Sequence, residues 1–245
     1  MDGKVALITG GARGIGRAVA LDLASRNWSV AICYRKSARE AGEVLDAIQK
    51  SGSVRGAAME CDVSDPEASK RLIGDVEKEW GRIDALIHCA GPYHRIGILE
   101  ETIEGWRSMF DSNLHSFFYL TQAAARGMIE RKCGRMICFS MANADQLIAQ
   151  PQLTAHYIAK VGLLVLTRTL ARVLAPHGIT ANAISPGFID SGSAPKEELQ
   201  TMAKRIPAGF VGTLDDAVSA VRFLLSDEAR YINGANIHLS GGWGI

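Results

Sequence analysis

The sequence has few cysteines, and their spacing argues against disulfide bonds and against a zinc site. The five cysteines are Cys33, Cys61, Cys89, Cys133 and Cys138, and no two of them follow the Cys-x-x-Cys spacing. An odd number without paired spacing argues against a disulfide framework and against a zinc site. We therefore expect no bound metal and a reducing compartment.

The sequence also lacks an excess of one charge and any long apolar run. Lys and Arg number 27 against 26 Asp and Glu, so the formal net charge is +1. This balance predicts no nucleic-acid partner and no attraction to a membrane surface. The apolar stretches are shorter than a membrane span, and the start of the chain has no pattern of a signal peptide. We expect a cytoplasmic protein with no membrane partner.

Short apolar segments alternate with amphipathic ones along the whole chain. At 245 residues and 47% apolar composition, it can bury a large core as one domain, 1–245. The predicted strands are 5–9, 30–33, 54–61, 85–89, 136–140, 179–184 and 237–239. The predicted helices are 14–26, 38–51, 66–80, 101–131, 153–176 and 214–226. This alternation is typical of α/β proteins with a doubly wound, Rossmann-type parallel sheet of about seven strands.

A glycine-rich turn lies between the first predicted strand and the first predicted helix. It reads Gly10-Gly11-Ala12-Arg13-Gly14-Ile15-Gly16. The glycines permit a tight turn, close approach of a phosphate to the backbone, and close packing of the helix on the strand. Free amides at the helix N-terminus can then bind a pyrophosphate. Arg17-Ala18 follows Gly16 in place of Lys-Ser or Lys-Thr, which excludes a Walker phosphate loop.

The turn after the second predicted strand lacks the acidic residue that binds the ribose 2′-hydroxyl of NAD. It reads Tyr34-Arg35-Lys36-Ser37, and Arg13 adds a further positive charge from the glycine turn. A carboxylate would repel a 2′-phosphate, whereas these side chains would bind it. A solvated basic turn before a helix is the plain alternative. We expect NADP(H) as the cofactor.

These motifs resemble those of the short-chain dehydrogenase/reductase family. The spacing Gly10-x-x-x-Gly14-x-Gly16 is similar to the family's glycine motif, and the resemblance continues along essentially the whole chain. It is greatest to the 3-oxoacyl-acyl-carrier-protein reductases of that family. The cofactor-binding positions that it implies are Gly10, Arg13, Gly14, Ile15, Gly16, Tyr34, Arg35, Lys36, Ser37, Asp62, Val63, Ala90, Gly91, Lys160, Pro186, Gly187, Ile189 and Ser191.

The resemblance also implies an activity. In that family NADPH delivers a hydride to the carbonyl carbon while a tyrosine protonates the oxygen, assisted by a lysine, a serine and an asparagine. The resemblance therefore implies reduction of a ketone, of the 3-oxoacyl thioester type, to a secondary alcohol in fatty acid biosynthesis. The thioester would be a small molecule or carried by an acyl carrier. The family also implies a homotetramer or homodimer.

Two of the family's catalytic residues, the asparagine and the lysine, have direct counterparts in this chain, and the tyrosine does not. Asn113 falls on the family's asparagine, and Lys160 falls on its lysine. The family spaces the two residues as Tyr-x-x-x-Lys, but here His156 stands four residues before Lys160 and Tyr157 comes one residue later. On an ideal helix that shift rotates the side chain by about 100°. Tyr157 would still neighbour Lys160, from another side.

The serine position departs from the family as well. The resemblance places the catalytic serine on Met141, and Ser140 is one residue early, so on a strand it should face the other way. The segment 142–155 is about two residues longer than is usual in the family, and His88-Cys89 replaces Asn-Asn. Pro92-Tyr93 and this longer segment would reshape the substrate wall, so a pterin or cyclic-carbonyl reductase is an alternative.

These departures leave three hypotheses for the chemistry. Tyr157 acts as the acid after a local adjustment of the helix start, or His156 replaces it, or the protein binds NADP with little or no turnover. The positive charge of Lys160 would lower the pKa of a nearby phenol and keep His156 neutral, which favours Tyr157 as the acid. The candidate catalytic residues are Asn113, Ser140, Tyr157, Lys160 and His156.

Overall fold

The computed structural model describes residues 3–50, 54–192 and 195–245 and confirms the doubly wound parallel sheet. Seven parallel strands are ordered β3-β2-β1-β4-β5-β6-β9. Their bounds are Val5–Thr9 (β1), Ser29–Tyr34 (β2), Gly56–Glu60 (β3), Ala85–His88 (β4), Gly134–Phe139 (β5), Ile179–Pro186 (β6) and Asn236–Leu239 (β9). Every strand end lies within two residues of the predicted one.

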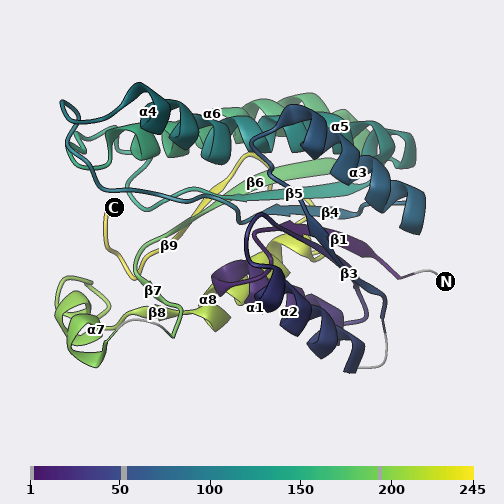
Figure 1. Ribbon diagram of the computed structural model, residues 1–245, viewed down its shortest axis with the longest axis horizontal. Helices are drawn as coiled ribbons and strands as arrows, with labels where there is room; N and C mark the ends of the chain where they lie inside the picture. The colour runs from purple at the N-terminus through teal and green to yellow at the C-terminus, as the bar shows by residue number, and fades with distance from the viewer. Residues whose placement is uncertain (1–2, 51–53, 193–194) are drawn as a thin grey trace.

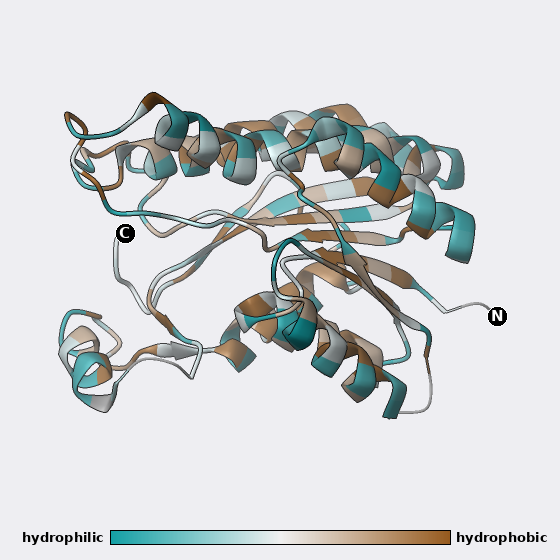
Figure 2. Cartoon of the chain, in the orientation of Figure 1, coloured by the Kyte–Doolittle hydropathy of each residue, from teal (hydrophilic) through white to brown (hydrophobic). Residues whose placement is uncertain are grey.

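Helices cover both faces of this sheet (Figure 1). On one face lie α1 (Gly14–Ser25), α2 (Ala38–Lys50) and α8 (Leu214–Leu225); on the other lie α3 (Pro66–Trp80), α5 (Ser116–Arg131) and α6 (Thr154–Leu174). Each face has its own cluster of buried apolar side chains. The strands are mostly hydrophobic, whereas the helices carry hydrophobic and hydrophilic residues in alternation (Figure 2). None of the helices in the described ranges could cross a membrane by its length and apolarity.

Helix boundaries follow local signals closely. Asp65 caps the N-terminus of α3, since its carboxylate accepts the amides of Glu67 and Ala68, and Pro66 takes the first helical position. The predicted helix 153–176 is α6 followed by a 3-10 turn, Ala175–His177. Ser51, the last residue of the predicted helix 38–51, lies outside the described residues.

The helix predicted over 101–131 is divided. It consists of α4 (Ile103–Phe110), a π-helical turn (Asp111–His115) and α5. Within this stretch side chains compete for backbone carbonyls: Ser112 Oγ donates to Ser108 O at 2.5 Å, and Asn113 Nδ2 donates to Met109 O at 3.0 Å. Such bonds locally displace the regular helical pattern. The wide turn falls on Asn113, one of the candidate catalytic residues.

A small lobe stands apart from the sheet and was not predicted. It contains β7 (Ile189–Asp190), which pairs in parallel with β8 (Gly212–Thr213), and the helix α7 (Lys196–Ala203). Figure 1 shows this lobe beyond the end of α8, on the side of the molecule where the chain ends. Two-residue strands are too short to show a period in the sequence, so this lobe gave no signal.

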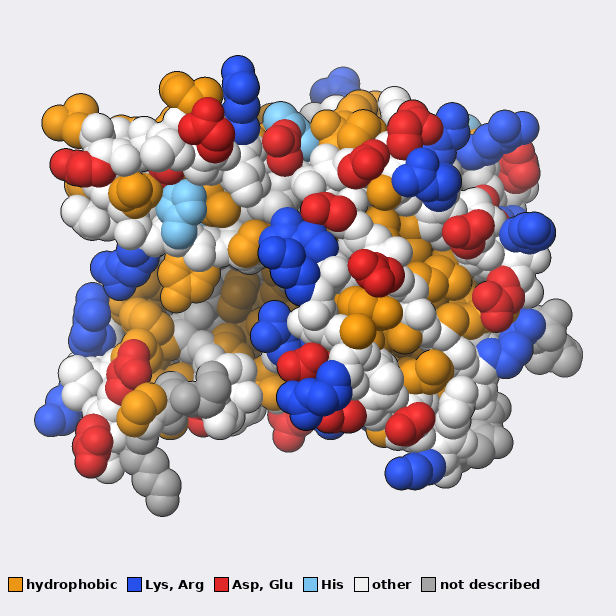
Figure 3. All heavy atoms as spheres, viewed as in Figure 1, with side chains coloured by type: hydrophobic (Ala, Val, Ile, Leu, Met, Phe, Trp, Pro, Cys, Tyr) orange, Lys and Arg blue, Asp and Glu red, His pale blue; other side chains and the backbone are white. Residues whose placement is uncertain are grey.

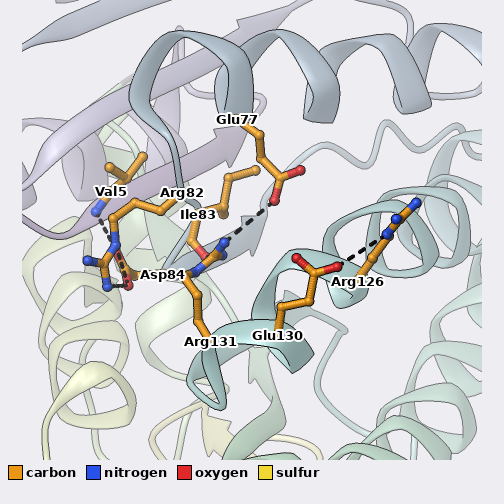
Figure 4. Close-up of polar contacts among 8 residues, drawn as sticks. All are labelled: Val5, Glu77, Arg82, Ile83, Asp84, Arg126, Glu130 and Arg131. Atoms are coloured by element: carbon orange, nitrogen blue, oxygen red, sulfur yellow. Dashed lines mark hydrogen bonds and ion pairs between the residues drawn. The ribbon is translucent and has the colours of Figure 1, made fainter.

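The amino ends of β1 and β4 are fixed by a buried carboxylate (Figure 4). Asp84 accepts the amide of Val5 at 2.8 Å and a two-pronged bond from Arg82 at 2.6 and 2.9 Å. Arg131, at the end of α5, donates to Ile83 O at 2.9 Å. These contacts anchor the end of the sheet opposite to the carboxyl ends of the strands, where the site lies.

Candidate active site

A cavity of about 360 Å³ opens at the carboxyl ends of β1, β2 and β4. Doubly wound sheets bind ligands at this edge. The register aligns Thr9 with Cys33 and with His88, so the residues that follow these three meet around one space. Figure 3 shows a hollow in the visible face with Lys and Arg side chains beside it. The cavity is lined by Gly10, Ala12, Arg13, Cys33, Tyr34, Arg35, Lys36, Ser37, Cys61, Asp62, Val63, Cys89, Ala90, Gly91, Pro92 and Ser112.

Gly10 and Gly16 of the glycine turn leave no room for a side chain. A Cβ on Gly16 would lie 2.5 Å from Gly10 O, and one on Gly10 would lie 3.0 Å from Ala90 N. Gly10 and Gly14 also have positive φ angles, +64° and +53°. No side chain of the described residues caps α1 at Arg13, and its first turn carries no acidic residue. The amides of this helix start are therefore free to bind an anion.

The basic turn after β2 lines part of the cavity. Tyr34, Arg35, Lys36 and Ser37 all line it, with Arg13 facing them from the glycine turn. Arg35 Nη1 lies 3.5 Å from Asp62 Oδ2, and both side chains are about half exposed. An exposed pair of this length contributes little energy, so Arg35 can exchange Asp62 for a phosphate.

Asp62 lines the same cavity and is held in place by Ser64. Its Oδ1 accepts Ser64 Oγ at 2.6 Å and the Ser64 amide at 3.1 Å. Burial acts to raise the pKa of Asp62, but the hydrogen bonds from Ser64 and the charge of Arg35 outweigh it and lower that pKa. The carboxylate is therefore ionised and fixed in orientation.

Three cysteines that the sequence did not assign to the site form one wall of the cavity. Cys33, Cys61 and Cys89 line it. Burial raises the pKa of Cys61 to about 11 and that of Cys89 to about 12, and it raises the pKa of Cys33 further. The thiols are therefore protonated and act as small apolar side chains.

His88 links the glycine turn to the π-helical turn through a buried chain of hydrogen bonds. Ser116 Oγ donates to the Ser112 carbonyl at 2.9 Å, so His88 Nε2 must donate to Ser116 Oγ, at 3.1 Å. His88 Nδ1 then accepts from Thr9 Oγ1 at 2.9 Å. Burial, followed by the charge of Lys160, lowers the pKa of His88 to about 3. His88 is therefore neutral and joins the end of β1 to the start of α5.

Asn113 and Lys160 face one buried space beside Gly91. A Cβ on Gly91 would lie 2.7 Å from Asn113 Oδ1 and 2.9 Å from Lys160 Nζ. Asn113 Nδ2 donates to Pro92 O at 3.0 Å, whereas Asn113 Oδ1 has no partner among the described residues. Lys160 Nζ donates to Phe139 O at 2.7 Å, and burial lowers the pKa of Lys160 to about 8. An unpaired acceptor beside a buried cation fits the hydroxyl groups of a bound ligand.

His156 lies one helical turn before Lys160 and is buried. Its side chain is 9% exposed, its ring lies 5.8 Å from that of Tyr93, and Nδ1 has no partner among the described residues. Burial and then the charge of Lys160 lower the pKa of His156 to about 3, against an opposite effect of the Pro92 carbonyl. The charge of Lys160 acts in the expected direction, and burial is the larger cause.

Tyr157 points away from this space, which corrects the expectation that its phenol turns back toward the nicotinamide. Its side chain is 5% exposed and belongs to the core on the α6 side of the sheet. The hydroxyl donates to Asn143 O at 2.8 Å and accepts the amide of Ile148 at 3.0 Å. Its rotation from the position of His156 along α6 sends the phenol into the segment that precedes the helix.

Ser140 also faces away from the cavity. It follows the end of β5 and is 4% exposed, and its Oγ donates to the carbonyl of Lys160 at 2.9 Å. The hydroxyl therefore ties β5 to α6. Met141, at the family's serine position, has no hydroxyl to offer a carbonyl substrate.

The residues expected near the nicotinamide lie beyond the lining of the cavity. Pro186 ends β6, and its carbonyl accepts the amide of Ala142 at 3.0 Å. Gly187 follows, with Ser240 so near that a Cβ would approach its Cβ to 3.0 Å. Ile189 belongs to β7, and Ser191 follows that strand. Gly14, Ile15, Gly16 and the catalytic candidates are likewise absent from the lining.

Comparisons with known proteins agree with this fold. Residues 10–244 match the family described as enoyl-(acyl carrier protein) reductase. A 3-oxoacyl-[acyl-carrier-protein] reductase of Staphylococcus aureus is 35% identical over 242 residues, 98% of this chain and 97% of that protein. A short-chain dehydrogenase of Burkholderia cenocepacia, solved in complex with NADP, has a TM-score of 0.90 and 31% identity and covers 98% of each chain. Acetoin dehydrogenase of Salmonella typhimurium has a TM-score of 0.90 and 29% identity, over 98% of this chain and 96% of that one.

Proposed function

The chain belongs to the short-chain dehydrogenase/reductase family, and on that premise we propose that it reduces a ketone to a secondary alcohol with NADPH. The observation that carries the cofactor is the basic turn Tyr34–Ser37, which lines the cavity where an NAD enzyme would have a carboxylate. NADPH, when bound, supplies the hydride. The relative in Staphylococcus aureus supports a 3-oxoacyl thioester, free or carried by an acyl carrier, as the substrate.

This chain has groups that suit the pyrophosphate, the 2′-phosphate and the nicotinamide ribose of that cofactor. The free amides of the α1 start would hold the pyrophosphate, and Arg13, Arg35, Lys36 and Ser37 would hold the 2′-phosphate. Lys160 and Asn113 would contact the nicotinamide ribose from the space beside Gly91. Because Asn113 Oδ1 has no other partner among the described residues, a hydroxyl donor there would satisfy it.

We assign the proton donor to His156. It holds the family's tyrosine position, it lies beside Lys160, and Tyr157 uses its hydroxyl elsewhere. The one N–H of the neutral imidazole bonds to the Pro92 carbonyl in the structure, and a ketone oxygen that replaces this carbonyl would receive the N–H, which would stabilise the negative charge that develops there. As the alcohol forms, the imidazole N–H proton moves to the oxygen, and the Lys160 ammonium returns a proton to the ring. Lys160, with a pKa of about 8, is still mostly charged at neutral pH.

A second candidate is an NADP-binding protein with little turnover. Two observations favour it: the Tyr157 hydroxyl is hydrogen-bonded to the carbonyl of Asn143, and Met141 stands at the family's serine position. The cofactor half of the site would be unaffected by either change. This protein would bind NADPH tightly and leave it unoxidised.

A spectrophotometric assay separates the two candidates. NADPH oxidation would be followed at ~340 nm, where the reduced nicotinamide absorbs, with 3-oxoacyl thioesters, cyclic ketones and pterins. We expect turnover of at least one carbonyl and its loss in Lys160→Ala. Calorimetry should also show weaker NADPH binding by Lys160→Ala. Tight NADPH binding without oxidation by any carbonyl would replace the reductase by the second candidate.

We also propose an assembly of two or four copies in the cytoplasm. Phe118 on α5, and Ile158 and Val165 on α6, are large apolar side chains that are between 41% and 59% exposed. The five cysteines are all free, which suits a reducing compartment. Light scattering should give a mass of at least twice 26.3 kDa, and a Val165→Glu variant should lower it. A monomer at micromolar concentration would contradict the assembly.

A further inference from the structure

Tyr157 is bonded to a single segment of the chain, and both of its bonds are to backbone groups. Its hydroxyl donates to Asn143 O and accepts from Ile148 N, so it closes a bridge across the residues between them. The ring is fixed because it is buried in the core on that side of the sheet. A hydroxyl that both donates and accepts has its hydrogen-bonding capacity in use. Loop 142–153, which joins β5 to α6, is therefore attached to the helix that carries His156 and Lys160.

The bridge spans the part of loop 142–153 with an unfavourable backbone. Asn143 and Leu147 have φ angles of +60° and +54°, which side chains rarely adopt, Leu less readily than Asn. The Tyr157 bonds fall on the carbonyl of Asn143 itself and on the amide that follows Leu147. Such a conformation persists only where surrounding contacts hold it. The phenol supplies two of those contacts.

The rest of the loop is fastened from other directions. The segment 96–98 pairs with it, since Ile96 N donates to Gln152 O at 3.0 Å and Ile98 N to Pro151 O at 3.1 Å. Asp145 lies 2.8 Å from His238 Nε2 on β9. These contacts hold the end of the loop and its outer side. Its centre is joined to α6 through Tyr157.

We propose that Tyr157 is a positioning residue that shapes the substrate side of the site by holding loop 142–153, and that it transfers no proton. The inference rests on the proposed reductase function for its meaning, but its structural part stands without turnover. Compared with the family's motif, the phenol lies one residue later on α6, where it holds a loop and does not donate a proton. The loop that it holds is the one that is longer than usual in the family. The shape of the ketone accepted is then set partly by this clamp.

The first test is hydrogen exchange of Tyr157→Phe, which keeps the ring and removes the hydroxyl. Exchange in a peptide spanning residues 143–150 should become at least tenfold faster, and exchange in β5 should stay the same. Tyr231→Phe, which removes a phenol hydroxyl from a side chain that is 98% exposed, should change neither peptide. Leu147→Asn, added to Tyr157→Phe, should recover at least threefold of the lost protection, since Asn accepts a positive φ more readily. Unchanged exchange over 143–150 would overturn the inference.

The second test is the kinetics of the same variant. Tyr157→Phe should raise KM for the ketone at least fivefold, keep kcat within threefold, leave the pH profile of kcat unchanged, and bind NADPH as before. A hundredfold loss of kcat with a lost pH limb would make Tyr157 the acid and overturn the clamp while keeping the reductase. If the unmodified protein reduces no ketone, the proposed function fails and hydrogen exchange alone decides this inference.

Discussion

The two halves of the site are built in different ways. The phosphate half, formed by the glycine turn, the basic turn and His88, relies on free backbone amides, on glycines without side chains, and on the hydrogen bonds that hold His88. The proton-transfer half, formed by residues 140–160 with Asn113, contains three buried polar atoms, Asn113 Oδ1, Asn143 Oδ1 and His156 Nδ1, without a partner among the described residues. The phosphate half offers free backbone amides to a ligand, and the proton-transfer half offers buried side-chain atoms.

The difference explains why one substitution can alter the proton-transfer half and leave the phosphate half unchanged. An anion site made of backbone amides and glycines does not depend on the direction of one side chain. A proton donor on a helix must point at one place, and a one-residue shift turns it by about 100°. The replacement of Tyr by His at position 156 therefore alters the chemistry without altering the cofactor site.

Lowering the pH should have the largest effect, on the stability of the fold, and each half of the site contributes one histidine to it. His88 and His156 both have a folded pKa of about 3 and an ordinary value of 6.5. Between these values the unfolded chain binds the proton and the folded chain does not, so stability falls as pH falls from 6.5 to 3. Each histidine should lower the free energy of unfolding by about 1.4 kcal/mol per pH unit in that window. Over the whole window this is on the order of 4 kcal/mol for each histidine.

Urea unfolding between pH 6.5 and 4.5 measures this slope. His156→Phe and His88→Phe should each reduce it by about 1.4 kcal/mol per pH unit. His156→Phe should leave NADPH binding within twofold, whereas His88→Phe should weaken it, because Thr9 and Ser116 lose their common partner. Equal slopes for the unmodified protein and His156→Phe would show that this histidine is protonated in the folded state.

Restoring the family's tyrosine should have the next largest effect. In His156→Tyr the phenol would stand one helical turn from Lys160, whose charge lowers a phenol pKa. We expect kcat to rise at least a hundredfold at saturating NADPH, about 2.7 kcal/mol of activation energy. Adding Tyr157→Phe should keep the gain. A gain that disappears in the double variant would return the acid role to Tyr157.

A side chain in the glycine turn should damage the phosphate half selectively. Gly16→Ala places a Cβ 2.5 Å from Gly10 O, which backbone must move to avoid. We expect the NADPH dissociation constant to rise at least thirtyfold, about 2 kcal/mol. Gly74→Ala on α3, where no atom lies within 4 Å of the new Cβ, is the matched control and should bind NADPH normally. Calorimetry that finds both variants equal would disprove the tight turn.

The smallest expected effect concerns the choice between the two nicotinamide cofactors. NADPH should bind at least tenfold more tightly than NADH, about 1.4 kcal/mol. Arg35→Ala should remove much of that preference, because Arg35 lines the cavity. Arg39→Ala, on the exposed side of α2 with a side chain that is 78% exposed, should retain it. Equal dissociation constants for the two cofactors in the unmodified protein would end the assignment to NADP.

Much of the fold could be predicted because its signals are local. The buried strands and most helices follow from apolar runs and caps such as Asp65-Pro66, and their ends agreed closely with the structure. The π-helical turn at Asn113 could not be predicted from the spacing of apolar residues, because it depends on side chains that bond to backbone carbonyls one turn away. The wall of cysteines was missed because their meeting depends on strand register.

The sequence by itself determined the order of strands and helices, the glycine and basic turns, and the replacement of the family's tyrosine by His156. Those features lie in contiguous residues, and backbone preferences and charge act on them directly. Only the tertiary structure decided that the Tyr157 hydroxyl binds loop 142–153, that His88 joins the two turns, and that Lys160 and Asn113 share a space beside Gly91. Those contacts join residues far apart in the chain, so their geometry exists only after the helices have packed on the sheet.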